Sequence, residues 1–242
     1  MTLLHSARLL VQRLGLDVRR FPGGQAGHRR ARLLKTHGVD CVFDIGASDG
    51  RYGLDLRRFG YSGRIVAFEP ASQAFAKLEA RAQRDDSWVA VRAALGRDAR
   101  FVTLNLAGND GASSSILPML QEHLDAAPQA RYVGHEAVEQ QRLDDVWQEL
   151  ALDSSRLFLK LDVQGYEREV LAGATLFLRR CIGVELELSF VPLYGGGMLY
   201  REVLDAMDRL GFTLMMLESG FTDERSGRML QADGVFFRES AH

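Results

Sequence analysis

The sequence predicts an α/β protein with a Rossmann-like, doubly wound and mostly parallel seven-stranded sheet, helices on both faces, and an N-terminal helical extension. From residue 39 onward, short apolar runs alternate with stretches of helical periodicity, a pattern typical of right-handed βαβ units. The early apolar runs lack polar alternation, as parallel strands buried on both faces do. The length of 242 residues and a hydrophobic content of 46% suit one such domain.

The expected strands and helices follow one another along residues 39–238. We expect strands at 39–45, 64–68, 88–91, 157–162, 182–188, 212–217 and 235–238, and helices at 51–59, 71–84, 141–150, 166–179 and 199–210. Residues 101–106 predict an extra strand, and a loop at 107–117 follows it. This segment interrupts the regular strand–helix alternation.

The first 38 residues differ from the rest in charge, so we separate a basic helical extension (1–38) from the main domain (39–242). The extension holds eight basic side chains and one acid, Asp17, whereas the remainder holds 22 basic and 31 acidic groups. Residues 3–16 have the spacing of an amphipathic helix, 21–27 form a turn, and 28–36 predict a second basic helix. This charge suggests contact with an anionic partner or a membrane surface. A solvated amphipathic helix explains the same pattern.

Composition disfavours several classes of protein. No apolar stretch approaches the roughly 20 residues that span a bilayer, and no secretory signal is visible. Cys41 and Cys181 lack the spacing of metal ligands, so we expect reduced packing residues and a cytoplasmic protein. We expect no nucleic-acid partner for a chain of net charge −2.

A glycine-containing loop follows the first expected strand. It reads Asp44-Ile45-Gly46-Ala47-Ser48-Asp49-Gly50 and leads directly into a helix. The two glycines allow a sharp turn and close approach to a ligand. A dinucleotide fingerprint needs two further glycines after Gly46, but Ser48 and Arg51 occupy those positions. The loop therefore argues against binding of a pyrophosphate.

Acidic residues around this loop fit S-adenosylmethionine, a nucleoside cofactor without phosphate. Asp44 and Asp49 can hold its amino group, directly or through water. The second expected strand ends in Glu69-Pro70, and a carboxylate there can accept both ribose hydroxyls. Plain turn glycines and a helix-start acid remain the alternative explanation of the same residues.

Charged residues on two central strands form the most unusual pattern. Lys160 and Asp162 share one strand face, and Glu185 and Glu187 share a face of the next strand. Burying these groups is costly unless they pair or meet a ligand. A structural Lys160–Glu185 ion pair is one explanation. Asp162 lies at a strand end, where active-site residues of such folds gather.

The chain resembles the FkbM family of S-adenosylmethionine-dependent methyltransferases over roughly residues 39–238. The matching stretches are 42–50, 65–70, 93–96, 113–115, 143–145 and the Lys-x-Asp-x-x-Gly-x-Glu run at 160–167. This resemblance implies a class I methyltransferase fold and, commonly, O-methylation of hydroxyls on sugars or secondary metabolites. The family often has Glu where this chain has Gln164 and Gly where it has Ala47.

These residues lead to specific expectations for the site. A hydroxyl needs a base during methyl transfer; Asp162 is the first candidate and Glu187 the second, with Lys160 orienting a carboxylate or substrate oxygen. Adenine is expected against the backbone around Ala94 and Leu95. The acceptor is expected to be a small molecule, glycan or glycolipid, and no dedicated metal site is expected.

Two other functions stay open at this point. An NAD-dependent oxidoreductase or epimerase can use a similar sheet, although the missing glycines count against it. A non-catalytic binding protein could retain the fold, although the joint presence of Asp44, Glu69 and Asp162 argues against loss of activity.

Overall fold

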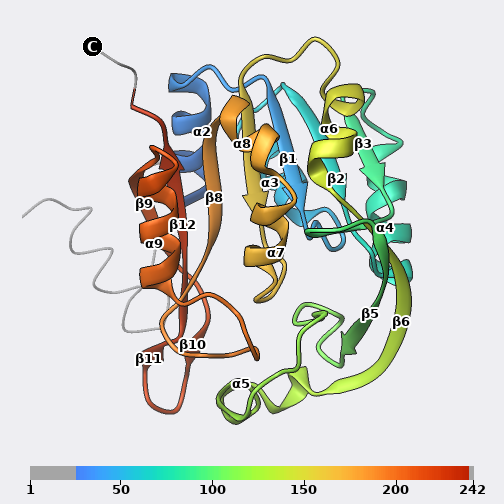
Figure 1. The fold of residues 1–242 in the computed structure, drawn as a ribbon, viewed down its shortest axis with the longest axis vertical. Helices are drawn as coiled ribbons and strands as arrows, with labels where there is room; N and C mark the ends of the chain where they lie inside the picture. Colours follow the sequence, from blue (N-terminus) through green and yellow to red (C-terminus); the bar gives the residue numbers. More distant parts are fainter. Residues whose placement is uncertain (1–25, 240–242) are drawn as a thin grey trace, which may run out of the picture.

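The computed structural model describes residues 26–239, and a seven-stranded sheet forms their centre (Figure 1). Its strands, in sheet order, are β3 (Trp88–Val91), β2 (Arg64–Phe68), β1 (Cys41–Ile45), β7 (Leu157–Leu161), β8 (Cys181–Ser189), β12 (Gln231–Phe237) and β9 (Thr213–Ser219). All neighbours pair in parallel except β12, which is antiparallel to β8 and β9. The predicted seven-stranded, mostly parallel sheet is confirmed.

Helices cover both faces of the sheet. One face carries α2 (Ala26–Thr36), α3 (Arg51–Arg58) and α4 (Ser72–Ala82), and the other carries α6 (Leu143–Ala151), α7 (Glu167–Ala172), α8 (Thr175–Arg180) and α9 (Tyr200–Arg209). The single helix predicted at 166–179 is wrong, because the chain breaks between α7 and α8 at Gly173 and Ala174. A side chain at Gly173 would put its Cβ 1.9 Å from the Gly96 carbonyl oxygen.

Residues 94–141 form an insertion between β3 and α6. Its elements are β4 (Ala94–Leu95), β5 (Arg100–Ala107), α5 (Gln121–Ala126), the 3₁₀ turn η1 (Pro128–Ala130) and β6 (Tyr132–Gln141). The three strands make a second sheet in the order β4-β6-β5. This arm lies beyond the carboxyl ends of the parallel strands (Figure 1). The predicted extra strand at 101–106 is confirmed as β5, whereas β6 was not predicted.

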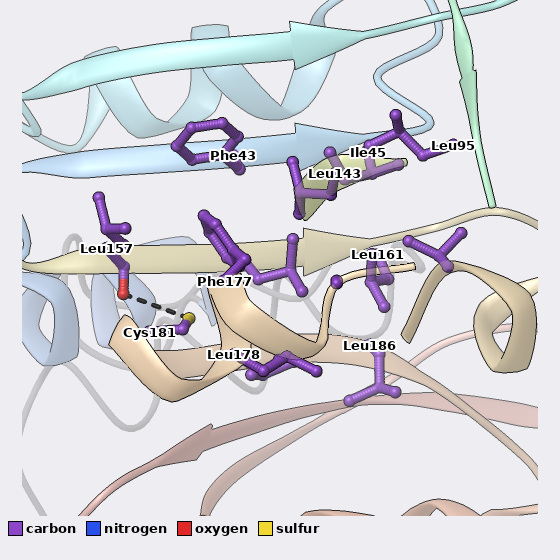
Figure 2. Packing of buried hydrophobic residues seen from close by; sticks show 14 of the residues in the cluster. Phe43, Ile45, Leu95, Leu143, Leu157, Leu161, Phe177, Leu178, Cys181 and Leu186 are labelled. Atoms are coloured by element: carbon purple, nitrogen blue, oxygen red, sulfur yellow. Dashed lines mark hydrogen bonds between the residues drawn. The ribbon is translucent and has the colours of Figure 1, made fainter. Parts of the chain in front are cut away.

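The two faces of the sheet are packed by alternating residues of each strand. On β1, Phe43 joins the cluster under α6–α9, while Val42 joins the cluster under α2–α4. Figure 2 shows Phe43 beside Phe177 of α8, with ring centroids 4.9 Å apart and planes at 67°. Truncating a buried phenylalanine of this kind to alanine costs about 3–5 kcal/mol.

Only part of the predicted N-terminal extension lies within the described residues. The second basic helix is confirmed as α2, whose Leu34 is fully buried in the core. The amphipathic helix expected at 3–16 lies outside residues 26–239, so the division at residue 38 stays a prediction. A hairpin of β10 (Thr222–Asp223) and β11 (Arg228–Met229) completes the fold. Within residues 26–239, no helix has the length and apolar character needed to cross a membrane.

Candidate active site

A cavity of about 340 Å³ lies where the carboxyl ends of β1, β2 and β7 face the insertion. We call it the strand-end cavity. Its lining combines the loop after β1 (Gly46, Ser48), the end of β2 (Glu69, Pro70), β4 (Ala94, Leu95), the loop after β7 (Asp162, Val163, Gln164) and the insertion (Leu104, Leu106, Ile116). Its size and mainly apolar walls with few polar groups suit a small-molecule site.

The loop after β1 is shaped by glycine. Gly46 has φ +75°, and a Cβ there would lie 1.9 Å from the backbone carbonyl oxygen of Asp162. The amides of Gly46 and Ala47 both donate to the Phe68 carbonyl, at 3.0 and 2.9 Å. Only glycine therefore lets this loop run between the ends of β2 and β7.

Glu69 presents a carboxylate at the cavity wall. Its two oxygens accept hydrogen bonds from the backbone amides of Ser48 and Ala71, each at 2.8 Å. Burial raises the pKa of Glu69 to about 7, although the two amide bonds act in the opposite direction. Carboxylate oxygens have further lone pairs, so Glu69 can still accept hydroxyl groups of a ligand.

The inner tier of charges, Asp44, Lys160 and Glu185, lies on neighbouring strands under α2 and α3. Lys160 Nζ is 3.0 Å from Asp44 Oδ1, and Asp44 is fully buried. Burial works against the Lys160 ammonium, but the carboxylates of Asp44 and Asp162 outweigh it and raise the pKa of Lys160. Asp44 thus acts as the counterion of Lys160 and does not line the cavity.

Glu185, the third inner residue, has a different partner from the one considered in the sequence. Arg30 of α2 donates to it from Nε at 2.8 Å and from Nη2 at 2.5 Å, and the Tyr52 hydroxyl donates at 2.8 Å. The alternative of a Lys160–Glu185 ion pair is therefore wrong. The sequence could not show that α2 brings a buried arginine to this strand.

The outer tier, Asp162, Glu187 and Asp233, lies nearer the carboxyl ends of β7 and β8. The Asp162 side chain lines the cavity, is 41% exposed, and has an oxygen 3.6 Å from Lys160 Nζ. Glu187 accepts hydrogen bonds from Gln164 and Gln231, each at 3.1 Å. Burial, reinforced by the negative charges of neighbouring acids, raises the pKa of Glu187.

The structure divides the expected site residues into two groups. The expected residues that line the strand-end cavity are Gly46, Ser48, Glu69, Pro70, Ala94, Leu95 and Asp162. The expected residues that do not line it are Asp44, Ala47, Asp49, Gly50, Lys160 and Glu187. Asp49 points toward α4, where its Oδ2 lies 3.1 Å from Arg81 Nη2. Gly50, with φ +83°, packs against Leu78 and Trp88 instead of a ligand space.

Several cavity residues come from the insertion and were not singled out from the sequence. Leu104 and Leu106 of β5 and Ile116 add apolar wall. Glu136 of β6 also lines the cavity, and its carboxylate accepts both the amide and the hydroxyl of Ser72, the first residue of α4. The sequence signals for this wall were the extra strand predicted at 101–106 and the serine run at 113–115.

Comparisons with known proteins find similarity in structure and in sequence. By structure, the chain is similar to TehB from Haemophilus influenzae (TM-score 0.48, 9% identity, covering 95% of this chain and 66% of that one). It is similar to a putative O-methyltransferase from Klebsiella pneumoniae (TM-score 0.48, 11% identity, covering 98% and 90%). By sequence, it is 28% identical to the 2-O-methyltransferase NoeI of Sinorhizobium fredii over 188 residues, 74% of this chain and 76% of that protein.

A family model also matches the chain. Residues 44–214 match the methyltransferase FkbM domain, a span that runs from the end of β1 into β9 and includes the inner tier together with Asp162 and Glu187 of the outer tier. Neither the NAD-dependent alternative nor the non-catalytic alternative gains support from any of these matches. The chain belongs to the FkbM methyltransferase family and is an S-adenosylmethionine-dependent methyltransferase.

Proposed function

We propose that this enzyme methylates a hydroxyl oxygen of a sugar, a glycolipid or a related secondary metabolite. The observation that carries this proposal is the accessible Asp162 carboxylate, which lines the strand-end cavity. The relative named as a 2-O-methyltransferase and the family resemblance support an oxygen nucleophile. Neither supports a nitrogen nucleophile.

The residues at the cavity fit the cofactor. Gly46 and Ser48 of the loop after β1 line the cavity, Glu69 offers oxygens to ribose hydroxyls, and Ala94, Leu95 and Leu104 offer an apolar wall to adenine. S-adenosylmethionine, when bound, supplies the electrophilic methyl group. Asp44 and Asp49 point elsewhere, so we no longer assign them direct contact with its amino group.

The chain's own task in the reaction is to align the acceptor and remove its proton. An alkyl hydroxyl does not ionise beforehand at neutral pH, so a base must take the proton as attack proceeds. We assign this role to Asp162, with Glu187 as the second candidate. The Lys160 ammonium lies 3.6 Å from the Asp162 carboxylate, and we assign Lys160 a positioning role rather than contact with the acceptor.

Calorimetry tests the cofactor assignment. The ligands are S-adenosylhomocysteine and NAD, and the variants are Glu69→Ala and, as a matched acid off the cavity, Asp49→Asn. Loss of a carboxylate that holds two hydroxyls should weaken S-adenosylhomocysteine binding by roughly ten- to over a hundredfold. Asp49→Asn and the wild type should bind equally, and NAD should not bind. Unchanged affinity in Glu69→Ala would show that the ribose lies elsewhere.

We further propose that residues 1–38 capture an anionic or membrane-associated acceptor. Within the described part of this segment, Arg29, Arg32 and Lys35 are exposed on α2. Deleting residues 1–20 should leave cofactor affinity unchanged and weaken acceptor affinity more at low than at high salt. Unfolding of the deleted protein would show that the segment is structural.

A cytoplasmic location is part of the same proposal. Cys41 and Cys181 are buried as free thiols, which suits a reducing compartment. Measuring enzyme in cytoplasmic and secreted fractions tests this directly.

A further inference from the structure

Gln164 has an unusual backbone and is held at both ends. Its φ is +52°, a left-handed conformation that is costly for a residue with a side chain. Its backbone carbonyl accepts a hydrogen bond from Ser115 Oγ at 2.7 Å, and its Oε1 accepts one from the Tyr194 hydroxyl at 2.6 Å. These contacts connect the end of β7 to the insertion and to the loop after β8.

The carboxamide nitrogen of Gln164 bridges the two candidate bases. Nε2 lies 2.7 Å from Asp162 Oδ1 and 3.1 Å from Glu187 Oε2. An ionised carboxylate only accepts hydrogen bonds, so the amide must turn its NH₂ group toward the two acids. The Tyr194 hydroxyl satisfies the remaining oxygen. Each of the two N–H bonds thus serves one carboxyl group.

The charged surroundings of the two acids are unequal. Charged and titratable groups face the two acids from every element packed around them. The acids among these groups are Asp44 on β1, Glu185 on β8, Glu167 on α7 and Asp233 on β12. The bases are Lys160 on β7 and Arg30 on α2, and two hydroxyls come from Tyr52 on α3 and Tyr194 after β8. The Lys160 ammonium lies within ion-pair distance of Asp162. Glu187 instead has Asp233 as its cross-strand partner. The charge is therefore better placed on Asp162 than on Glu187.

We propose that Gln164 is a positioning residue whose carboxamide ties Asp162 and Glu187 into one unit, with Asp162 as the ionised member that takes the acceptor's proton. This inference rests on the proposed function. A glutamate at this position would remove the donor and add a third acid. Gln164 leaves the pair with one bridging donor and no added charge.

The first test uses the ligand-free protein, so it does not depend on methyl transfer. Gln164→Glu places a carboxyl group among acids, and its pKa should be raised in the folded state. Such a group binds more protons folded than unfolded, so stability falls as pH rises above about 4.5. In urea denaturation, the ratio of variant to wild-type unfolding constants should be about tenfold larger at pH 8 than at pH 5.

Two further variants separate this mechanism from a loss of packing. Gln164→Met removes the bridge without adding charge. Gln231→Met is the matched control, because Gln231 Nε2 donates to Glu187 and Ser189 but makes no contact with Asp162. Both neutral variants should show destabilisation that depends much less on pH than that of Gln164→Glu.

The second test is the pH profile of kcat. The acid limb, which reports the base in the enzyme–substrate complex, should move up by about one pH unit in Gln164→Glu. It should stay in place in Gln231→Met. A pH-independent loss of stability together with an unmoved limb would overturn the proposal, as would equal limb shifts in Gln164→Glu and Gln231→Met. Failure of the proposed function would appear separately, as wild-type enzyme that binds S-adenosylhomocysteine but transfers no methyl group to a hydroxyl acceptor.

Discussion

The inner and outer charge tiers are neighbours along β7 and β8, yet their surroundings differ. Lys160 and Asp162 are two residues apart, but Lys160 forms a buried ion pair with the fully buried Asp44, whereas Asp162 keeps 41% of its side chain exposed. Glu185 is enclosed by Arg30 and Tyr52. Glu187, two residues further along β8, accepts a hydrogen bond from Gln164.

Under the proposed function, position along a strand, more than residue type, separates the structural charges from the charge that acts in catalysis. A buried charge is tolerated only when it is paired, and breaking such a pair is strongly destabilising. The inner tier therefore cannot release a carboxylate for proton transfer without unfolding the sheet centre. Asp162 of the outer tier is not enclosed in this way, because its side chain is 41% exposed and the residue lines the strand-end cavity.

The largest expected effect is on turnover in Asp162→Asn. The substitution preserves shape and removes basicity, so kcat should fall by about 10²–10⁴-fold. Binding of S-adenosylhomocysteine should change little, which is measured by calorimetry on the same sample. If turnover survives in Asp162→Asn and is lost in Glu187→Gln, the base is Glu187 on β8, and the exposed Asp162 is not the catalytic member of the outer tier.

Removing Lys160 should affect stability next most strongly. Lys160→Met leaves Asp44 buried without its counterion, which should lower the free energy of unfolding by about 3–5 kcal/mol. The double substitution Asp44→Asn with Lys160→Met removes both charges and should recover much of that loss. Urea denaturation measures both. If the double variant is no more stable than Lys160→Met alone, the broken Asp44–Lys160 pair is not the cause of the lost stability.

Arg30 extends the inner tier into the predicted N-terminal extension. Arg30→Met should lower the free energy of unfolding by about 3 kcal/mol, the lower end for a broken buried pair, because this guanidinium retains slight exposure. The neighbouring exposed residue gives the control, and Arg29→Met should change stability by about 0.5 kcal/mol or less. If Arg30→Met and Arg29→Met both change the free energy of unfolding by a similar, small amount, the result would support a separate extension that ends at residue 38.

Glu69 gives the smallest effect, through pH. Burial raises the pKa of Glu69 to about 7. The protonated carboxyl therefore stabilises the folded state at low pH, and this contribution is lost as pH rises from the pKa of the unfolded state toward 7. Affinity for S-adenosylhomocysteine should instead fall as pH falls, by up to about tenfold per pH unit below 7, because the protonated carboxyl accepts hydrogen bonds from hydroxyls poorly. Calorimetry on Glu69→Gln should show no such dependence. An unchanged slope there would assign the titration to another group.

The sequence predicted best what depends on local pattern. The seven-stranded sheet, the Gly46 turn and Glu69 at the end of β2 all follow from apolar runs and residues adjacent to them. It failed where a distant element decides the contact. Arg30 reaches Glu185 across 155 positions, and Asp49 turns to Arg81, so neither partner can be read from spacing.

The insertion illustrates a second limit. β6 is largely exposed and polar along its ten residues, so hydrophobic periodicity gives no strand signal there. It is held instead by pairing with β5 and β4. The cavity wall that it helps to form could therefore not be predicted from composition or spacing.

The most direct test of the two-tier account compares the free energies of unfolding of Asp44→Asn and Asp162→Asn by urea denaturation at pH 7. Each substitution removes one carboxylate next to the same Lys160 ammonium. The account predicts a loss of about 3 kcal/mol or more for Asp44→Asn and of about 1 kcal/mol or less for Asp162→Asn. Equal losses, or a larger loss for Asp162→Asn, would contradict the division between structural and chemical charges.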